Sequence, residues 1–195
     1  MRLLDVGPSF QTQLFRDLYP EVVVTTLGLE PSAVSTARPG ERHIEFDLND
    51  AFYPDAWPSV DPHPLVVMAE VIEHLYTSPV RVLRCAATWL EPSGLLVLQT
   101  PNAAALFKRL KLLAGRNPYH MIRETRTNPG HFREYTLTEL RRAVDASGLE
   151  LVRCERRNYF DGPSWWHAVY RATRRTMPDS LRQGITMVLR RPLGR

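Results

Sequence analysis

Short apolar runs alternate with helical patterns of apolar residues along the first hundred positions. The runs at 2–6, 22–29, 43–46, 65–68 and 95–98 predict strands. Apolar residues recur at helical spacing over 10–19 and 78–90, and Ser9 is the predicted N-cap of the first helix. Because uninterrupted apolar strands suit a sheet buried on both faces, we expect an α/β fold with a doubly wound, mostly parallel sheet and helices on both faces.

The second half of the chain continues this pattern less regularly. The patterns predict a basic helix at 103–114, a helix at 136–147 with Thr136 as one candidate N-cap and Gly148 at its end, and strands at 149–154 and 185–189. The sheet then has seven strands, the last of them antiparallel. We expect a single domain over 1–195, with a cofactor-binding half at 1–102 and substrate-facing segments at 103–135 and 156–182.

Polar side chains interrupt the apolar pattern directly after the run at 65–68. If a helical turn starts there, Glu70, Glu73 and His74 occupy positions i, i+3 and i+4 and share one face. They would lie at the carboxyl end of a buried strand, where open α/β sheets bind ligands. Two adjacent carboxylates repel one another unless a cation, a proton or an arginine compensates them, and a divalent metal is one such answer. A helix-start carboxylate, a solvated carboxylate and a carbonyl-bonded histidine explain the same residues without a metal, so both readings stay open.

Composition excludes several classes of protein. The net charge is +4 and comes almost wholly from arginine, with Lys108 and Lys111 as the only lysines, so nucleic-acid binding is open but not favoured. Cys85 and Cys154 are isolated, which predicts neither a zinc site nor a disulfide framework and fits a reducing cytoplasm. No apolar run approaches the ~20 residues that span a bilayer, and no signal peptide precedes the first strand, so we expect a cytoplasmic protein without a membrane partner.

The strand ends indicate the kind of cofactor. The first strand runs into Asp5 and Gly7, and the second ends at the acidic Glu30, which is the layout for an adenosine-containing cofactor whose ribose pairs with the second acid. The loop GPSF keeps only one glycine of the GxGxxG pattern, so a pyrophosphate would find little close backbone contact. A phosphate-free adenosine cofactor is therefore favoured.

Six segments of the sequence resemble, in order and spacing, the motifs of the class I S-adenosylmethionine-dependent methyltransferases. They are LLDVGPSF, LGLEPSAV, FDLND, VVMAEVIEHL, GLLVLQTPN and HFREYTLTELRRAVDASGLELV, within residues 3 to 155. The resemblance implies a Rossmann-like methyltransferase fold. It also implies that Asp5 and Gly7 line the methionine end of the cofactor, Glu30 the ribose, and Asp47 and Leu48 the adenine, with Ala69 and Glu70 close by. The chain departs from the family in its glycine-poor first loop and in having no helix before the first strand.

Within that family, GluxxGluHis followed by a later His resembles the metal-dependent 2′-O-methyltransferases of small RNAs, and its first part also resembles the ubiquinone-pathway O-methyltransferases. The later histidine here is His131. The resemblance implies a divalent ion held by Glu70, Glu73, His74 and His131. Mixed carboxylate and imidazole ligands suit Mn or Zn as well as Mg. The alternative for His131 is a loop histidine with no special role.

A bound metal would activate and orient an acceptor hydroxyl, and two open coordination positions would fit a vicinal diol. Such diols occur in sugars, at RNA 3′ ends and in catechols. The candidates for the proton acceptor are His131, His74 and His120. Since the chain is short and has no RNA-binding module, we expect a saccharide O-methyltransferase. RNA 2′-O-methylation, small-molecule or catechol O-methylation, and cofactor binding without catalysis remain alternatives, and a homodimer is open.

Overall fold

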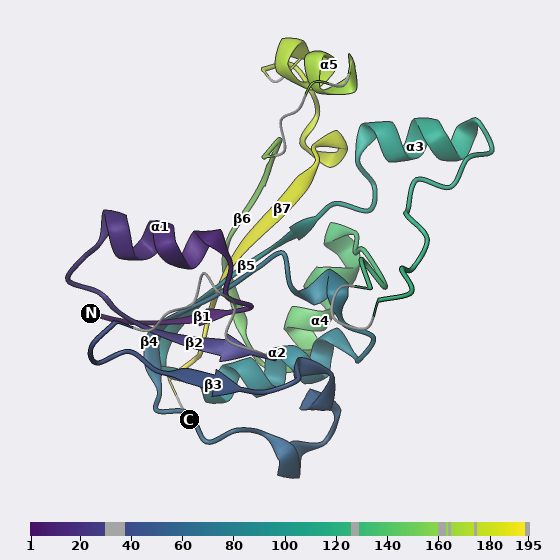
Figure 1. The fold of residues 1–195 in the computed structure, drawn as a ribbon. Helices are drawn as coiled ribbons and strands as arrows, with labels where there is room; N and C mark the ends of the chain where they lie inside the picture. Colours follow the sequence, from purple (N-terminus) through teal and green to yellow (C-terminus); the bar gives the residue numbers. More distant parts are fainter. Residues whose placement is uncertain (30–37, 126–128, 160–162, 164, 174, 194–195) are drawn as a thin grey trace.

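The computed structural model describes residues 1–29, 38–125, 129–159, 163, 165–173 and 175–193, and its core is one seven-stranded sheet (Figure 1). The strands are β1 Arg2–Val6, β2 Val23–Gly28, β3 His43–Glu45, β4 His63–Ala69, β5 Leu90–Pro101, β6 Glu150–Arg157 and β7 Gly184–Arg190. Their order is β3-β2-β1-β4-β5-β7-β6, and only β7 runs antiparallel to its neighbours. This confirms the expected doubly wound, mostly parallel sheet. Glu30 and the side chain of Trp166 lie outside the described residues.

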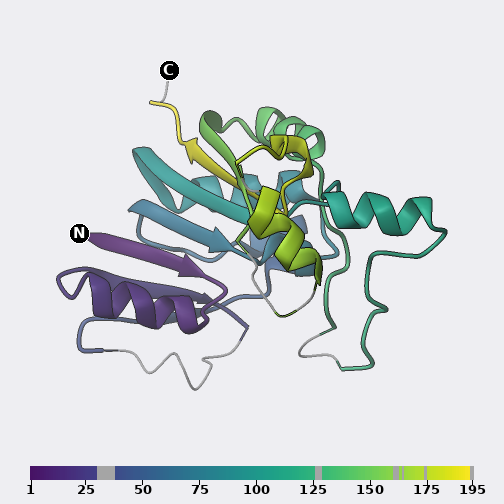
Figure 2. The ribbon, with the colours of Figure 1, turned by 90° about the horizontal axis from the view of Figure 1, so that it is seen from above.

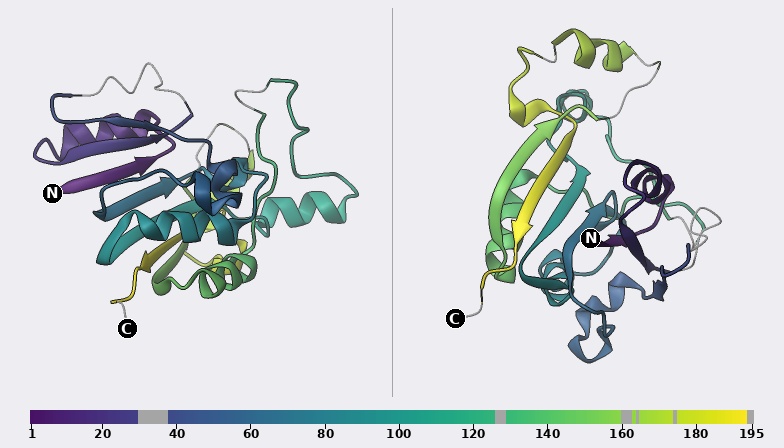
Figure 3. Two further views of the ribbon diagram at one scale, coloured as in Figure 1. Left: turned by 90° about the horizontal axis from the view of Figure 1, so that it is seen from below. Right: turned by 90° about the vertical axis from the view of Figure 1, so that its left-hand side faces the viewer.

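Helices cover both faces of the sheet. Helix α1 Phe10–Leu18 lies on one face, and α2 Pro79–Thr88 and α4 Leu137–Ser147 pack together on the other (Figure 1). Helix α3 Leu106–Leu113 follows the carboxyl end of β5, and α5 Trp165–Thr173 connects β6 to β7. Because Pro101 at the end of β5 pairs with Gly184 at the start of β7, α3 and α5 project from the same end of the sheet (Figure 3). None of the described helices has the length and apolarity to cross a membrane.

Local sequence signals set the helix ends. Ser9 caps α1 through a capping box with Thr12, and Thr136 caps α4 through a capping box with Glu139. Gly148 ends α4 with φ +86°, a left-handed conformation that glycine adopts without a Cβ clash. Each of these signals is local, and α1 starts at Phe10 and α4 ends at Ser147, as the sequence predicted.

The main hydrophobic core lies between the sheet and the pair α2 and α4. Fully buried Leu83, Trp89, Leu96 and Leu140 belong to it. A smaller cluster beneath α1 is built from Leu3, Val22, Val24 and Val67, with Phe15 packed against it. The sheet is therefore anchored mainly through its α2 and α4 face.

Three predicted details differ from the structure. Helix α2 stops at Thr88 and β5 already begins at Leu90, because Trp89 is buried and its carbonyl accepts the His63 amide as the chain turns into the sheet. Helix α3 is shorter than the predicted 103–114. After β4, the chain forms only the short 3-10 turn Ile72–His74, and Glu70 precedes it with φ +56°. The prediction that Glu70, Glu73 and His74 share a helical face is therefore wrong.

Candidate active site

The candidate site lies at the carboxyl ends of β1, β4 and β5, which is the edge where open α/β sheets bind ligands. The loop after β1 closes against both neighbouring strands. A Cβ on Gly7 would lie 2.5 Å from Cγ2 of Val71, and Gly7 has φ +75°. A Cβ on Gly28 would lie 3.1 Å from Cδ of Pro8. The one glycine that remains from the family pattern therefore stands where the backbone needs it, and Pro8 packs against the end of β2.

Asp5 is buried at the base of this loop. Its Oδ2 atom accepts a hydrogen bond of 2.6 Å from the hydroxyl of Thr12. Burial raises the pKa of Asp5 from 3.8 to about 6, although the Thr12 bond and the charge of Arg16 partly offset this. The carboxyl thus connects β1 to α1, and its role at the methionine end of a cofactor remains a prediction.

The raised pKa of Asp5 predicts a pH-dependent stability. Since the folded state favours the protonated carboxyl, its contribution is most favourable below 3.8 and is lost as the pH rises through about 6. Asp5→Asn is therefore expected to match wild type near pH ~4 and to exceed its free energy of unfolding near pH ~7 by up to about 3 kcal/mol. Urea unfolding without cofactor measures this. Asp55→Asn, which removes an exposed carboxyl, is the control. A difference in free energy of unfolding between Asp5→Asn and wild type that is equal at both pH values would contradict the prediction.

The remaining predicted cofactor residues line the same edge. The Oδ1 atom of Asp47 accepts the backbone N–H of Asn49 at 2.9 Å and so caps the 3-10 helix Leu48–Phe52, in which Leu48 is buried. Ala69 is half-buried at the end of β4. These positions are compatible with the adenine and methionine contacts that the family resemblance implies, which stay predictions.

Glu70 turns away from the regular strand in a left-handed conformation. Its backbone N–H donates to the Gln99 carbonyl at 2.9 Å, and its Oε1 accepts from Nε2 of Gln99 at 3.4 Å. Burial raises its pKa, while its interactions with Glu73 and Gln99 and the charge of Lys108 lower it. Its side chain is thus directed by β5 rather than by a helix.

Glu73 is the most buried acid of the site, with 0% exposure. Its Oε2 accepts a 2.9 Å hydrogen bond from the Thr100 hydroxyl, whereas its Oε1 has no hydrogen-bond partner among the described residues. Burial, and then the nearby Glu70 carboxylate, raise its pKa. A buried oxygen without a donor is costly, and a bound cation would remove this cost.

His74 and His131 complete a compact group with Glu73. One potential ligand atom from each of the three side chains lies within 4.8 Å of the other two. The two imidazole rings meet edge to face with centroids 4.7 Å apart. The structure thus brings together three of the four ligands that the resemblance implied, and Glu70 lies outside this group.

Both imidazoles are held by their Nδ1 atoms. Nδ1 of His74 lies 3.0 Å from the Gly130 carbonyl, and Nδ1 of His131 lies 3.1 Å from Oε1 of Glu134. Because a carbonyl can only accept, Nδ1 of His74 carries the proton and its Nε2 keeps a lone pair. Burial lowers the pKa of His74, and burial together with the charge of His74 lowers that of His131 to about 4. Both rings are therefore neutral near neutral pH, the state in which imidazole binds metals.

Backbone hydrogen bonds bring these distant segments together. The N–H groups of Phe132 and Arg133 both donate to the Glu73 carbonyl, at 2.9 and 3.2 Å. Tyr135 forms an isolated parallel bridge with Asn102 after β5. His74 and Gly130 are 56 residues apart in the sequence, and these contacts place them side by side.

Sequence reasoning missed Glu134 and the specific place of Lys108. The Glu134 side chain is 8% exposed, and its Oε2 accepts a hydrogen bond from Nζ of Lys108. The same Nζ donates to the Asn102 carbonyl at 3.1 Å. Burial lowers the pKa of Lys108 to about 8, against the opposing charges of Glu70 and Glu73. A carboxylate on Nδ1 of a ligating histidine fixes the ring orientation and increases its basicity. The spacing of three residues from His131 to Glu134 was the available signal.

His120, the third predicted catalytic histidine, lies on the exposed segment after α3. Its charge contributes to lowering the pKa of His131, so the two rings are close enough to interact electrostatically. It is not part of the three-residue ligand group.

A family model described as a methyltransferase domain matches residues 1–153, which is more than half of the chain. The chain belongs to this methyltransferase family. The match covers all the predicted motifs up to β6 and confirms the resemblance to class I S-adenosylmethionine-dependent methyltransferases. S-adenosylmethionine is accordingly the cofactor of the family to which this methyltransferase belongs.

Solved structures share the fold of this methyltransferase at low sequence identity. A protein described as a methyltransferase from Bacillus halodurans C-125 aligns with a TM-score of 0.62 and 15% identity, covering 98% of this chain and 92% of that one. A SAM-dependent methyltransferase from Archaeoglobus fulgidus gives 0.60 and 14%, with 97% and 85% covered. A protein described as a sarcosine dimethylglycine methyltransferase from Galdieria sulphuraria gives 0.59 and 12%, with 98% and 78% covered. These likenesses establish the fold alone.

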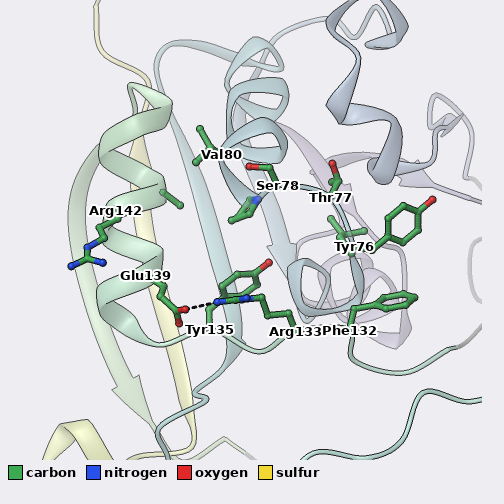
Figure 4. A pocket seen from close by; sticks show the side chains of 12 residues that line it. Tyr76, Thr77, Ser78, Val80, Phe132, Arg133, Tyr135, Glu139 and Arg142 are labelled. Atoms are coloured by element: carbon green, nitrogen blue, oxygen red, sulfur yellow. Dashed lines mark hydrogen bonds and ion pairs between the residues drawn. The ribbon is translucent and has the colours of Figure 1, made fainter.

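The methyltransferase has an open groove beside the ligand group. Its volume is about 640 Å³, and it is lined by residues 75–80 and by side chains from the segment 132–143 (Figure 4). Tyr76 and Phe132 form its exposed aromatic side, with ring centroids 5.6 Å apart. Arg133 pairs with Glu139 across its other side at 2.6 Å. The groove therefore uses little of the predicted substrate-facing segment 103–135 and none of 156–182.

Proposed function

We propose that this chain is a divalent-metal-dependent O-methyltransferase that acts on a hydroxyl of a saccharide. The observation that carries the metal is the buried carboxyl of Glu73, whose Oε1 has no donor among the described residues and which places an oxygen within 4.8 Å of a nitrogen of each of two imidazoles. The observation that supports a sugar acceptor is the aromatic side of the adjacent groove.

The donor set fits a divalent ion. Glu73 offers a carboxylate oxygen, and His74 and His131 offer Nε2 atoms while their Nδ1 atoms are engaged. Oxygen and imidazole donors suit Mn and Zn as well as Mg. Glu70, which the family resemblance implies as a fourth ligand, influences Glu73 electrostatically from outside the group of three.

The residues of the site have separate roles in the proposed reaction. S-adenosylmethionine, when bound, supplies a methyl group on a sulfonium, and transfer breaks the methyl–sulfur bond as the acceptor oxygen takes the methyl carbon and loses its proton. A divalent ion, when bound, supplies the positive charge that makes an alcohol easier to deprotonate. Glu134 orients His131 through Nδ1. His120 takes the proton, since it is exposed and lies outside the ligand group.

Sugar recognition would come from Tyr76 and Phe132. Their rings are exposed and lie at the mouth of the groove, next to the segment that holds His131. The apolar face of a pyranose packs well against such rings, while its hydroxyls remain available for hydrogen bonds. Ser78, which also lines the groove, offers a hydroxyl partner.

A methyl-transfer assay tests this function. Labelled S-adenosylmethionine is offered with oligosaccharides, with an RNA that ends in a free 3′ diol, and with a catechol, each in MgCl2, MnCl2 or EDTA. We expect transfer to the saccharide, its loss in EDTA and its return with Mg or Mn. Tyr76→Ala is expected to raise KM for the saccharide about tenfold with little change in kcat.

Tyr19→Ala, at an exposed tyrosine on the distant end of α1, is the matched control and should leave KM unchanged. Full activity in EDTA would contradict the metal dependence. Transfer to RNA or to the catechol, with none to any saccharide, would contradict the proposed acceptor.

A further inference from the structure

Two segments of the chain carry positive charge with no acidic side chain among them. Residues 103–123 and 163–178 contain eight of the 25 Lys and Arg residues and none of the 21 Asp and Glu residues. The rest of the chain consequently has more acidic than basic side chains. The net positive charge of the chain therefore lies in these two segments, because the 17 basic residues elsewhere are outnumbered by the 21 acidic ones.

The same segments expose large apolar side chains. Leu113 on α3 is 85% exposed, Met121 in the segment after α3 is 88% exposed, and Trp165 on α5 is 66% exposed. Leu110, Leu112, Ile122 and Val169 are also exposed. A soluble surface rarely gathers so many large apolar side chains without a partner. We give the name basic-apolar rim to these seven side chains together with the described basic side chains that lie outside the active site, which are Arg109, Lys111, Arg116, Arg123, Arg171 and Arg175.

The two helices of the rim lie at one end of the molecule. Helices α3 and α5 both project from the carboxyl end of the sheet, well away from its core (Figures 2 and 3). They touch through Phe107 and Tyr170, whose ring centroids lie 6.3 Å apart, and the Phe107 N–H donates to the Tyr170 hydroxyl at 3.3 Å.

A groove of about 200 Å³ runs between the two helices. Leu110, Trp165 and Val169 line it, and Lys111 and Arg116 stand on the same lining. An apolar groove bordered by cations is complementary to an acyl chain joined to an anionic headgroup.

We propose that the basic-apolar rim docks this methyltransferase on the surface of a bilayer that contains anionic lipids. Exposed aliphatic and Trp side chains enter the headgroup region, while Lys and Arg pair with lipid phosphates. Charge alone would also suit an RNA, but a polyanion gives no reason to expose Leu112, Leu113 and Met121. The sequence-based expectation of no membrane partner rested on the missing spanning segment, and peripheral docking needs none.

Docking would present the active site to the bilayer. Helix α3 follows β5, whose Thr100 donates its hydroxyl hydrogen bond to Glu73. Lys108 of α3 donates to Glu134, the carboxylate that orients His131. An acceptor hydroxyl carried by a membrane lipid would then lie on the same side as the site. The docking itself does not require the metal or the saccharide, so its test stands apart from that of the proposed function.

Vesicle sedimentation tests the proposal with the full chain. We expect binding to vesicles of phosphatidylcholine mixed with phosphatidylglycerol, and little binding to phosphatidylcholine alone. Raising the salt from about 0.1 M to about 1 M, which shortens the Debye length from about 10 to about 3 Å, should weaken binding. The tryptophan emission of the chain should shift to the blue with the anionic vesicles, and the Trp165→Phe variant should show a smaller shift.

Two double variants separate the contributions. Lys111→Glu with Arg116→Glu, and Leu112→Glu with Leu113→Glu, are each expected to lower vesicle partitioning about tenfold or more. Arg141→Glu on α4 and Leu18→Glu on α1, both at exposed positions, are the matched controls and should bind as wild type. Unchanged affinity for S-adenosylhomocysteine verifies that every variant is folded.

Three results would overturn the proposal. They are equal binding to both kinds of vesicle, binding that the apolar variant leaves intact, and absence of vesicle binding with salt-sensitive binding to a single-stranded RNA. The last result would assign the rim to nucleic acid instead.

Discussion

Glu73→Gln is expected to weaken Mn²⁺ binding more than about 100-fold and to remove methyl transfer, while the protein stays folded. Glutamine has the shape of the carboxyl and can still accept the Thr100 bond that now reaches Oε2 at 2.9 Å. It cannot supply the anionic oxygen that the Glu73 carboxylate offers beside the two imidazoles. Stability should not fall, because the substitution removes a buried acid whose charged form is disfavoured by burial and by Glu70.

Calorimetric titration with MnCl2 measures the Mn²⁺ affinity, and thermal unfolding measures the stability. Glu134→Gln should lose about 10- to 100-fold in Mn²⁺ affinity, because it orients His131 without being a ligand. The matched control is Glu21→Gln at an exposed position, which should bind metal as wild type. Wild-type Mn²⁺ affinity in Glu73→Gln would show that Glu73 is not a metal ligand.

Gly7→Ala is expected to lower both stability and cofactor affinity. The residue has φ +75°, which costs an alanine roughly 1–2 kcal/mol. The new Cβ would also lie 2.5 Å from Cγ2 of Val71, and relieving such an overlap costs about 1–3 kcal/mol more. Because a loop that moves away from Val71 to relieve the overlap is displaced from the cofactor edge of the sheet, S-adenosylhomocysteine should bind at least about tenfold more weakly.

Gly148→Ala separates the cost of the left-handed backbone from the cost of the contact with Val71. Gly148 has φ +86°, but its Cβ would meet nothing within 4 Å, so the variant should show only the backbone cost and keep wild-type cofactor affinity. Adding Val71→Ala to Gly7→Ala should restore part of the cofactor affinity by removing the overlapping methyl group. Equal effects of Gly7→Ala and Gly148→Ala on stability and on S-adenosylhomocysteine binding would show that the contact with Val71 has no importance.

The sequence by itself determined the elements and the family of this protein. Strands such as Arg2–Val6 and helices such as Leu137–Ser147 follow from apolar runs, helical spacing and caps, all of which act between residues a few positions apart. The order of these elements then leaves few ways to build the sheet, because parallel strands need right-handed crossovers. The family motifs lie at the ends of those same strands.

Only the tertiary structure decided how the site is assembled. Glu70 left the expected helical face because its amide is bonded to Gln99 on the neighbouring strand. His131 reached His74 because the Phe132 and Arg133 amides bind the Glu73 carbonyl. The ion pair of Glu134 with Lys108 and the groove beside Tyr76 also arise where segments distant in the sequence meet. These contacts join segments that are far apart in the chain, and local periodicity contains no information about which distant backbone groups will pair.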